Sequence, residues 1–253
     1  MKPRIMGVLN CTPDSFYDGG RFNDLIGRGM QMVNSGADIV DVGGESTRPN
    51  AVPVSLEEEL ERVIPVVSAL SPHVTVSIDT TKPRVAEAAY AAGATVLNDV
   101  RGLKDKEMQE VSALFPSCVI MHSRGTPQTM QTQTHYSDLS LEVFDWLLAQ
   151  AQICQSKEVI LDPGIGFAKT AAQSLRLIKD LEQLALHGYP VLIGASRKSF
   201  IGHTLNQASP DERLPGSLAA LAASYSRGAK VFRVHDVRES KDVVDLLWAI
   251  DHA

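Results

Sequence analysis

Residues 39–49, which read IVDVGGESTRP, decide the fold. Ile39 to Val42 are rich in β-branched apolar side chains, which is typical of a short strand buried on both faces, as in a parallel sheet. Gly43 and Gly44 then allow a turn or a close approach to a ligand. Residues 45–48 follow with a carboxylate, two hydroxyls and a guanidinium. The pattern predicts a buried strand that carries polar chemistry at its C-terminal end.

The composition limits the class of protein. The chain has 253 residues, of which 44% are hydrophobic and 21% charged, as in globular proteins. A net charge of −6 argues against a general nucleic-acid or membrane-surface binder. Cys11, Cys118 and Cys154 show neither disulfide nor zinc spacing, which favours a reducing cytoplasm. The apolar run over residues 5–9 is too short for a membrane span.

Short apolar runs alternate with helical patterns along the whole chain. The expected strands cover residues 5–10, 39–43, 74–79, 95–99, 118–122, 159–162, 190–195 and 230–235. Eight strand–helix units without a linker predict an α/β protein with one (β/α)₈ barrel domain over residues 1–253. The alternative is a doubly wound open sheet. That fold usually has a glycine-rich turn after its first strand, and residues 10–13, NCTP, are not such a turn.

Two helices have recognisable start signals. Ser55 and Glu58 have the spacing of a capping box, and Pro65 is expected to kink or shorten the helix that follows. The last helix is expected to begin at Asp236, with Glu239 three residues later.

Polar residues stand at the C-terminal end of nearly every expected strand. They are Asn10, the loop 45–48, Asp79, Asn98, Asp99, His122 after Met121, Asp162, the run 196–198, Arg233 and His235. A buried polar group without a partner costs about 1–3 kcal/mol, so a purely structural barrel would carry fewer of them. For a single Asp or Asn, the structural alternative is capping of the next helix, which explains Asp99 and Asp236 better. We therefore expect a functional site at the C-terminal mouth of the barrel.

These polar residues divide by charge. Asp79, Asn98 and Asp162 suit a flat heterocycle with an N–C–NH₂ edge, because a carboxylate accepts two hydrogen bonds from such an edge. Arg48, Arg233 and His235 suit an anion, and residues 233 and 235 share one face of a strand. The sequence shows no Ser-His-Asp set, H-E-x-x-H helix or Walker loop. The expected site orients and neutralises its ligands more than it performs nucleophilic chemistry.

Seven motifs, in this order, resemble dihydropteroate synthases. They are LNCTPDSF at 9–16, GGESTRP at 43–49, SIDT at 77–80, LND at 97–99, LDPGIGF at 161–167, SRKS at 196–199 and RVHD at 233–236. The resemblance implies a (β/α)₈ barrel of folate biosynthesis that joins 4-aminobenzoate to a dihydropterin methyl diphosphate. It also implies release of pyrophosphate, Mg²⁺ as cofactor, small-molecule substrates and a homodimer.

The resemblance further implies roles for individual residues. The residues that would bind the pterin are Asp79, Asn98, Met121, Asp162 and Lys198. The diphosphate would be bound by Asn10, Arg48, Arg233 and His235, with Asn10 also at the metal. The aminobenzoate would be bound by Thr47, Arg48, Pro49, Phe167 and Ser199. Catalysis would rest on Asn10, Arg48, Lys198, Arg233 and His235. The loop 11–23, with Asp14, Phe16 and Asp18, would close over the reacting centre.

Some positions depart from the family pattern. Ala168 and Asn50 stand where glycine is usual, and the short N-terminus leaves open how the floor of the barrel is covered.

Two other functions are possible. A methyltetrahydrofolate-corrinoid methyltransferase would reuse the Asp/Asn floor without needing residues 45–49, and a catalytically silent pterin-binding paralogue would not need the intact cationic residues.

Overall fold

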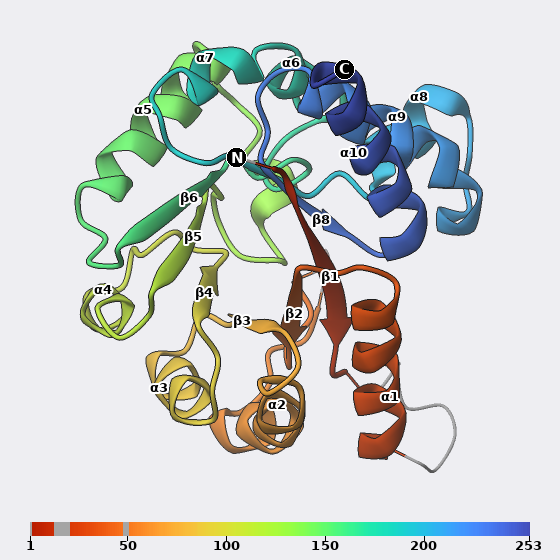
Figure 1. The fold of residues 1–253 in the computed structure, drawn as a ribbon. Helices are drawn as coiled ribbons and strands as arrows, with labels where there is room; N and C mark the ends of the chain where they lie inside the picture. Colours follow the sequence, from red (N-terminus) through yellow and green to blue (C-terminus); the bar gives the residue numbers. More distant parts are fainter. Residues whose placement is uncertain (1, 13–20, 48–50) are drawn as a thin grey trace.

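Parallel strands form a single sheet that curls into a barrel (Figure 1). The structure, a computed structural model, describes residues 2–12, 21–47 and 51–253. Within them, the sheet order is β6-β5-β4-β3-β2-β1-β8-β7. The strands are β1 (Arg4–Asn10), β2 (Ile39–Gly43), β3 (Thr75–Asp79), β4 (Val96–Asp99), β5 (Ser117–Met121), β6 (Glu158–Asp162), β7 (Leu192–Ile193) and β8 (Val231–Val234).

The two ends of this sheet meet between β6 and β7. Leu161 forms a parallel bridge with Val191, and its N–H donates to the carbonyl oxygen of Pro190 at 2.9 Å. β7 is shorter than the predicted run 190–195, and Pro190 cannot donate a backbone hydrogen bond to a neighbouring strand. The bridge closes the sheet, so the (β/α)₈ prediction is confirmed and the doubly wound alternative is wrong.

Helices surround the barrel, and at least one follows every strand (Figure 1). They are α1 (Arg21–Asn34), α2 (Leu56–Leu70), α3 (Pro83–Ala91), α4 (Lys106–Ser112), η2 (Met130–Thr132), α5 (Leu139–Ala151), α6 (Ala171–Lys179), α7 (Leu181–Ala185), α8 (Ser199–Leu205), η3 (Pro210–Arg213), α9 (Leu214–Tyr225) and α10 (Val237–Asp251). Across the described residues, every helix is too short or too polar to traverse a lipid bilayer.

Two helix predictions differ in part from the structure. The Ser55 hydroxyl does cap α2 by accepting from the N–H of Glu58, but α2 continues through Pro65 to Leu70 and is not shortened. Its buried face, which includes Val66 and Val67, packs on the core beyond the proline and holds the last turns in place. Asp236 precedes α10 without capping it, because its carboxylate accepts hydrogen bonds from a guanidinium instead.

The barrel interior is layered. One cluster of buried apolar residues, distinct from the core between sheet and helices, fills its lower part with Met6, Ile39, Val96, Val119, Ile160, Leu192 and Val231. Side chains two positions later on a strand point to the same side. On β2, β4, β5, β6 and β8 the residues one layer above are Asp41, Asn98, Met121, Asp162 and Arg233. An apolar plug therefore supports a mostly polar layer.

An ion pair crosses the barrel below this plug. Arg4, at the start of β1, donates through Nη2 and Nη1 to both carboxylate oxygens of Glu158, at the start of β6, at 2.8 and 3.2 Å. The Ser117 hydroxyl, at the start of β5, donates to Glu158 at 2.6 Å. β1 and β6 are not neighbours in the sheet, so this contact joins opposite sides of the N-terminal opening. It covers part of the floor of the barrel.

We expect Glu158→Gln to lower the free energy of unfolding at pH 7 by about 1–3 kcal/mol, because Arg4 loses a charged, bidentate partner. Burial alone would raise the pKa of Glu158, but its bonds from Arg4 and Ser117 outweigh burial and hold that pKa below its usual 4.5. A depressed carboxyl pKa contributes stability above the unfolded pKa, and this contribution is lost as the pH falls through the folded pKa. The difference from wild type should therefore shrink below pH 4.5.

Urea unfolding followed by tryptophan fluorescence, at pH 7 and at about pH 4, measures both effects. Glu87→Gln is the control, because Glu87 forms a long, exposed pair with Arg84 at 3.8 Å and should change nothing measurable. Equal unfolding midpoints for wild type and Glu158→Gln at pH 7 would show that this pair does not hold the floor.

Candidate active site

A buried network joins four strands in the middle of the barrel. Arg233 on β8 donates through Nε to Oδ2 of Asp41 on β2 at 2.6 Å, and through Nη2 to Oδ2 of Asp79 on β3 at 2.7 Å. Nδ2 of Asn98 on β4 donates to the same Asp41 oxygen at 3.1 Å. Asp41 is fully buried and Asp79 is 7% exposed. One recess thus contains both a member of the predicted ring site and a member of the predicted anion site.

Lys198 and Asp162 form the neighbouring wall of the recess. Asp162, at the end of β6, is 6% exposed and accepts from the N–H of Gly164 at 2.7 Å. Lys198 donates through Nζ to the carbonyl oxygen of Ile165, and the same Nζ lies 4.6 Å from the centroid of the Phe167 ring. Lys198 therefore ties the loop after β6 to the loop after β7.

Electrostatic coupling shows that these groups share one environment. Burial raises the pKa of Asp79 to about 7, with Arg233 opposing and Asp41 adding to the rise. Burial also raises the pKa of Asp162, against the pull of Lys198, and lowers the pKa of Lys198 to about 8. For Arg233, burial acts to lower the pKa, but Asp41 and Asp79 outweigh it and raise the pKa. The recess holds charges that compensate one another.

A buried lysine, Lys169, supports the loop after β6. Lys169 is 3% exposed, donates to the carbonyl oxygen of Phe167 at 2.9 Å and lies 3.1 Å from Nδ1 of His122. Burial lowers the pKa of Lys169 to about 7 and that of His122 to about 2. His122 packs edge-on against Trp146, with ring centroids 5.1 Å apart. His122 therefore serves the support of the loop and does not face a ligand.

Ala168 adopts a left-handed conformation in this loop, with φ of +51°. Such a φ favours glycine, the residue that is usual at this position in the family pattern. The carbonyl oxygen of Ala168 accepts from the Tyr136 hydroxyl at 3.1 Å, so the alanine preserves the turn under external support.

Half-buried charges around the buried Glu59 hold the start of the loop after β2. Nζ of Lys82 donates to Glu45 at 2.5 Å and also to Glu59, which accepts from the Thr80 hydroxyl at 2.7 Å. Arg62 donates to the carbonyl oxygen of Gly44 at 2.8 Å. The start of the loop, up to Glu45, therefore has a defined position next to the end of β2.

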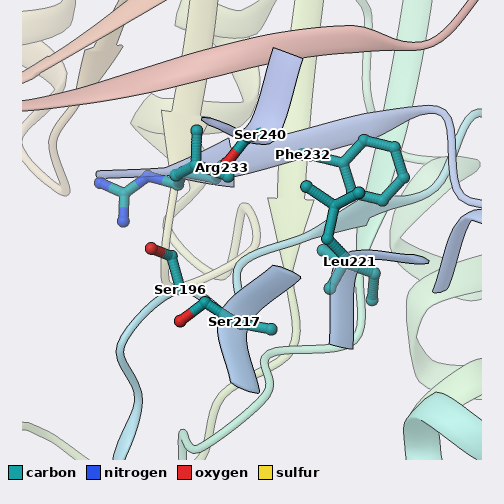
Figure 2. A pocket seen from close by; sticks show the side chains of 9 residues that line it. Ser196, Ser217, Leu221, Phe232, Arg233 and Ser240 are labelled. Atoms are coloured by element: carbon teal, nitrogen blue, oxygen red, sulfur yellow. The ribbon is translucent and has the colours of Figure 1, made fainter. Parts of the chain in front are cut away.

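Residues on β8 alternate between core and recess. Figure 2 shows Phe232 pointing toward Leu221 of α9, while the guanidinium of Arg233 extends away from it. The crevice between β8 and α9 measures about 10 Å³, which is room for about one water molecule, so it is not a substrate site. Figure 2 also places Ser196 on the side of Arg233.

His235 lies beyond the end of β8, at the rim. Its backbone N–H donates to Oγ of Ser196 at 3.2 Å, and its Nδ1 lies 3.1 Å from the same oxygen. The next carboxylate in the chain, Asp236, is paired with Arg197 at 2.9 Å and does not complete a triad. His235 also lines an open hollow of about 380 Å³ between α1 and the start of α10, together with Arg28 and Arg238.

The structure brings most predicted site residues to one end of the barrel. Five of them lie at the C-terminal ends of strands: Asn10 on β1, Asp79 on β3, Asn98 on β4, Met121 on β5 and Asp162 on β6. Thr47, Phe167, Lys198, Ser199 and His235 lie in or next to the loops at the same end, with Ser199 exposed as the first residue of α8. Arg48, Pro49, Asp14, Phe16 and Asp18 lie outside the described residues.

Two residues of the recess and its support are absent from the predicted site. Asp41 lies within the predicted apolar strand. A carboxylate in a strand buried on both faces needs a charged or hydrogen-bonding partner. This need is the sequence signal that could have identified Asp41. Ser77, its register partner on β3, is also buried. Lys169 has no predicted role. Asp99 was expected to cap a helix but instead accepts from the N–H groups of Arg101 and Leu103, both at 2.8 Å, and shapes the turn after β4.

The recess suits a flat, nitrogen-rich ring. Two N–H groups of an N–C–NH₂ edge can bond one carboxylate as a guanidinium does. In the structure the guanidinium of Arg233 donates one hydrogen bond of this kind to Asp79, through Nη2, so this carboxylate is placed to accept from such an N–H group. Lys198 and His235 lie toward the rim, where both side chains carry nitrogen groups that can donate hydrogen bonds.

Comparison with known proteins agrees with this geometry. A family model described as pterin binding enzyme matches residues 6–235. A dihydropteroate synthase of Synechocystis sp. is 46% identical over 259 residues, covering 96% of this chain and 90% of its own length. The Yersinia pestis dihydropteroate synthase, solved with a sulfonamide drug complex, has a TM-score of 0.92 at 36% identity, covering 100% of this chain and 95% of its own. The Thermus thermophilus dihydropteroate synthase in complex with 4-aminobenzoate has a TM-score of 0.88 at 41% identity, covering 98% and 94%. This chain therefore belongs to the dihydropteroate synthase family of pterin-binding enzymes.

Proposed function

We propose that the recess binds the pterin of (7,8-dihydropterin-6-yl)methyl diphosphate, and that the enzyme joins its methylene carbon to the amine of 4-aminobenzoate. The carbon–oxygen bond to the diphosphate breaks, and its electron pair leaves with pyrophosphate. The amine nitrogen forms the new bond and loses a proton to water, which gives 7,8-dihydropteroate. The observation that carries this proposal is the buried set of Asp79, Asn98 and Asp162 in a chain of this family.

The pterin half of the site is assigned to the buried layer. Asp162 and Asp79 accept from N–H groups of the ring, Asn98 contributes an amide, and Lys198 donates to a ring acceptor. Met121, which is 3% exposed, supplies an apolar contact. Since burial raises the pKa of both carboxyl groups, a ligand that donates several hydrogen bonds relieves their desolvation.

The diphosphate half is assigned to the rim, where Asn10, Arg48, Arg233 and His235 would gather. A departing diphosphate gains negative charge on the oxygen that leaves the carbon. Fixed cationic donors stabilise this charge most in a dry site, where removal of one donor typically costs about 3 kcal/mol of transition-state stabilisation. This electrostatic term replaces the nucleophile and base of other transferases.

The aminobenzoate half is assigned to Thr47, Arg48, Pro49, Phe167 and Ser199. The half-buried Phe167 ring, with Lys198 over it, offers a flat apolar surface to an aromatic acid. An aromatic amine is neutral at pH 7 and needs no strong base to attack. We therefore propose a dissociative course, in which the methylene carbon gains cationic character before the amine arrives.

Asn10 fits a role at Mg²⁺. Mg²⁺ takes oxygen ligands and usually keeps one or two protein ligands beside substrate phosphates and water. The half-buried Asn10 side chain has no hydrogen-bond partner among the described residues. Within the same residues, no group of three or more His, Cys, Asp or Glu side chains is placed to hold a metal ion. The amide oxygen of Asn10 would hold the ion, which would neutralise charge on the diphosphate.

Assembly and location complete the proposal. Leu246 and Ile250, one turn apart on α10, are 64% and 61% exposed, which favours a homodimer through this helix. The free thiols of Cys11, Cys118 and Cys154 agree with a reducing cytoplasm. We assign residues 1–253 to one pterin-binding domain.

The direct test supplies purified protein with the dihydropterin diphosphate, 4-aminobenzoate and Mg²⁺. We expect pyrophosphate and dihydropteroate in equal amounts, and a loss of turnover when EDTA removes the ion, restored by excess Mg²⁺. Binding of the pterin without formation of either product would identify a silent paralogue and contradict the proposal.

We expect Asp162→Asn to weaken pteroate binding by about 10- to 100-fold, because the ring loses a charge-assisted acceptor. Isothermal calorimetry measures the affinity. Asp99→Asn is the matched control, because Asp99 also ends a strand, β4, but its carboxylate accepts only from backbone N–H groups. This substitution should leave the affinity for pteroate unchanged. Wild-type affinity in Asp162→Asn would exclude the assigned role.

A further inference from the structure

Asp41 has an unusual position for a strand carboxylate. It is fully buried, its Oδ2 accepts from both Arg233 and Asn98, and its Oδ1 is buried without a protein partner. Asp41 lies opposite Ser77 in the sheet, whereas Asp79 lies opposite Gly43, so Asp41 is two residues deeper in the barrel than Asp79. Asp41 therefore stands beneath the ring site and not in its wall.

Arg233 divides its bonds between these two depths. Its Nε is bound to the deep Asp41 at 2.6 Å, and its Nη2 to the shallower Asp79 at 2.7 Å. Under the proposed function, a pterin needs the Asp79 carboxylate. The ring and Nη2 therefore compete for the same acceptor, and one bond of Arg233 must break when the ring enters.

A buried guanidinium that loses its only carboxylate would be strongly unfavourable, because an unpaired buried charge costs several kcal/mol. Asp41 removes this obstacle, since it keeps Nε paired while Nη2 is released. With this bond kept, the planar guanidinium can tilt as a whole about Nε, taken up by rotation of the aliphatic side-chain bonds, so that its terminal N–H groups turn toward the rim, where the diphosphate would lie. The Nε bond is the fixed point of this motion.

We propose that Asp41 is a positioning residue: it holds Nε of Arg233 as a pivot, so that entry of the pterin at Asp79 frees the guanidinium end for the diphosphate. This inference rests on the proposed function and adds a coupling between the two halves of the substrate. The ring does not merely occupy its recess. It also releases the cation that binds its own leaving group.

The same carboxylate orients Asn98. The Asp41 oxygen that already accepts from Arg233 also accepts from the NH₂ group of Asn98, which fixes the orientation of this amide. Its Oδ1 is then left to accept from a ligand. Asp41 thereby makes Asn98 an acceptor beside Asp79 and Asp162, which selects for a ring edge rich in donors.

The test compares two ligands in Asp41→Asn. Pteroate lacks the diphosphate and reports ring binding, including any effect through Asn98, whereas the dihydropterin diphosphate also reports the anion site. We expect the affinity for the diphosphate ligand to fall roughly tenfold more than the affinity for pteroate, the size of one charged hydrogen bond. In an Arg233→Met background, Asp41→Asn should not lower the affinity for the diphosphate ligand any further relative to the affinity for pteroate. Equal losses for the two ligands, or a full additional loss in the double variant, would overturn the pivot.

A measurement on the wild-type protein covers the case in which Asp41→Asn does not fold. The ¹⁵N-edited NMR signal of the Arg233 Nε–H, assigned by its absence in Arg233→Lys, should stay protected from solvent exchange both without ligand and with pteroate. Rapid exchange once pteroate is bound would show that Asp41 lets go of Nε, and the pivot would be wrong. The proposed function is tested separately by dihydropteroate formation in wild type, so either idea can fail alone.

Discussion

The fork of Arg233 between Asp41 and Asp79 is the interaction on which the active end of this barrel depends. A guanidinium and two carboxylates in the middle of a barrel are stable only when each charge has a partner, because desolvation is otherwise too costly. The structure meets this condition with strands that come from opposite ends of the chain. The ion pairs therefore join strands from the two ends of the chain and assemble the site with the same atoms.

An apolar layer makes this arrangement possible. The plug that includes Met6, Ile39 and Val231 fills the lower barrel, so the charges above it are kept from water at the bottom opening. Below the plug, Arg4 and Glu158 span that opening. The order from floor to mouth is an ion pair, an apolar layer, a polar layer and loops, and only the last two layers are open to ligand chemistry.

The sequence predicts this order only in part, and the reason is physical. Strand ends are predictable because a (β/α)₈ barrel gathers them at one mouth, so Asp79, Asn98 and Asp162 can be grouped from the sequence alone. Charges inside a strand are harder to interpret, because their partners lie far away in the chain, as Arg233 does from Asp41. The local pattern assigns Asp236 to helix capping for the same reason, since it cannot show that Arg197 binds this carboxylate.

The pairing of charges also bears on how such a site can work without a base or nucleophile. A recess that is already neutralised by its own side chains can exclude water before the substrate arrives, but each internal pair must be exchanged for a contact with the ligand. Exchange is favourable only if the ligand repeats the chemistry that it displaces: an N–C–NH₂ edge in place of the Arg233 guanidinium at Asp79, and a diphosphate in place of Asp79 at Arg233. A substrate that carries both groups on one small molecule satisfies both sides of the broken pair. Under the proposed function, a ligand with the ring edge alone would leave Arg233 paired only with Asp41, whereas the complete substrate would provide partners for both Asp79 and Arg233.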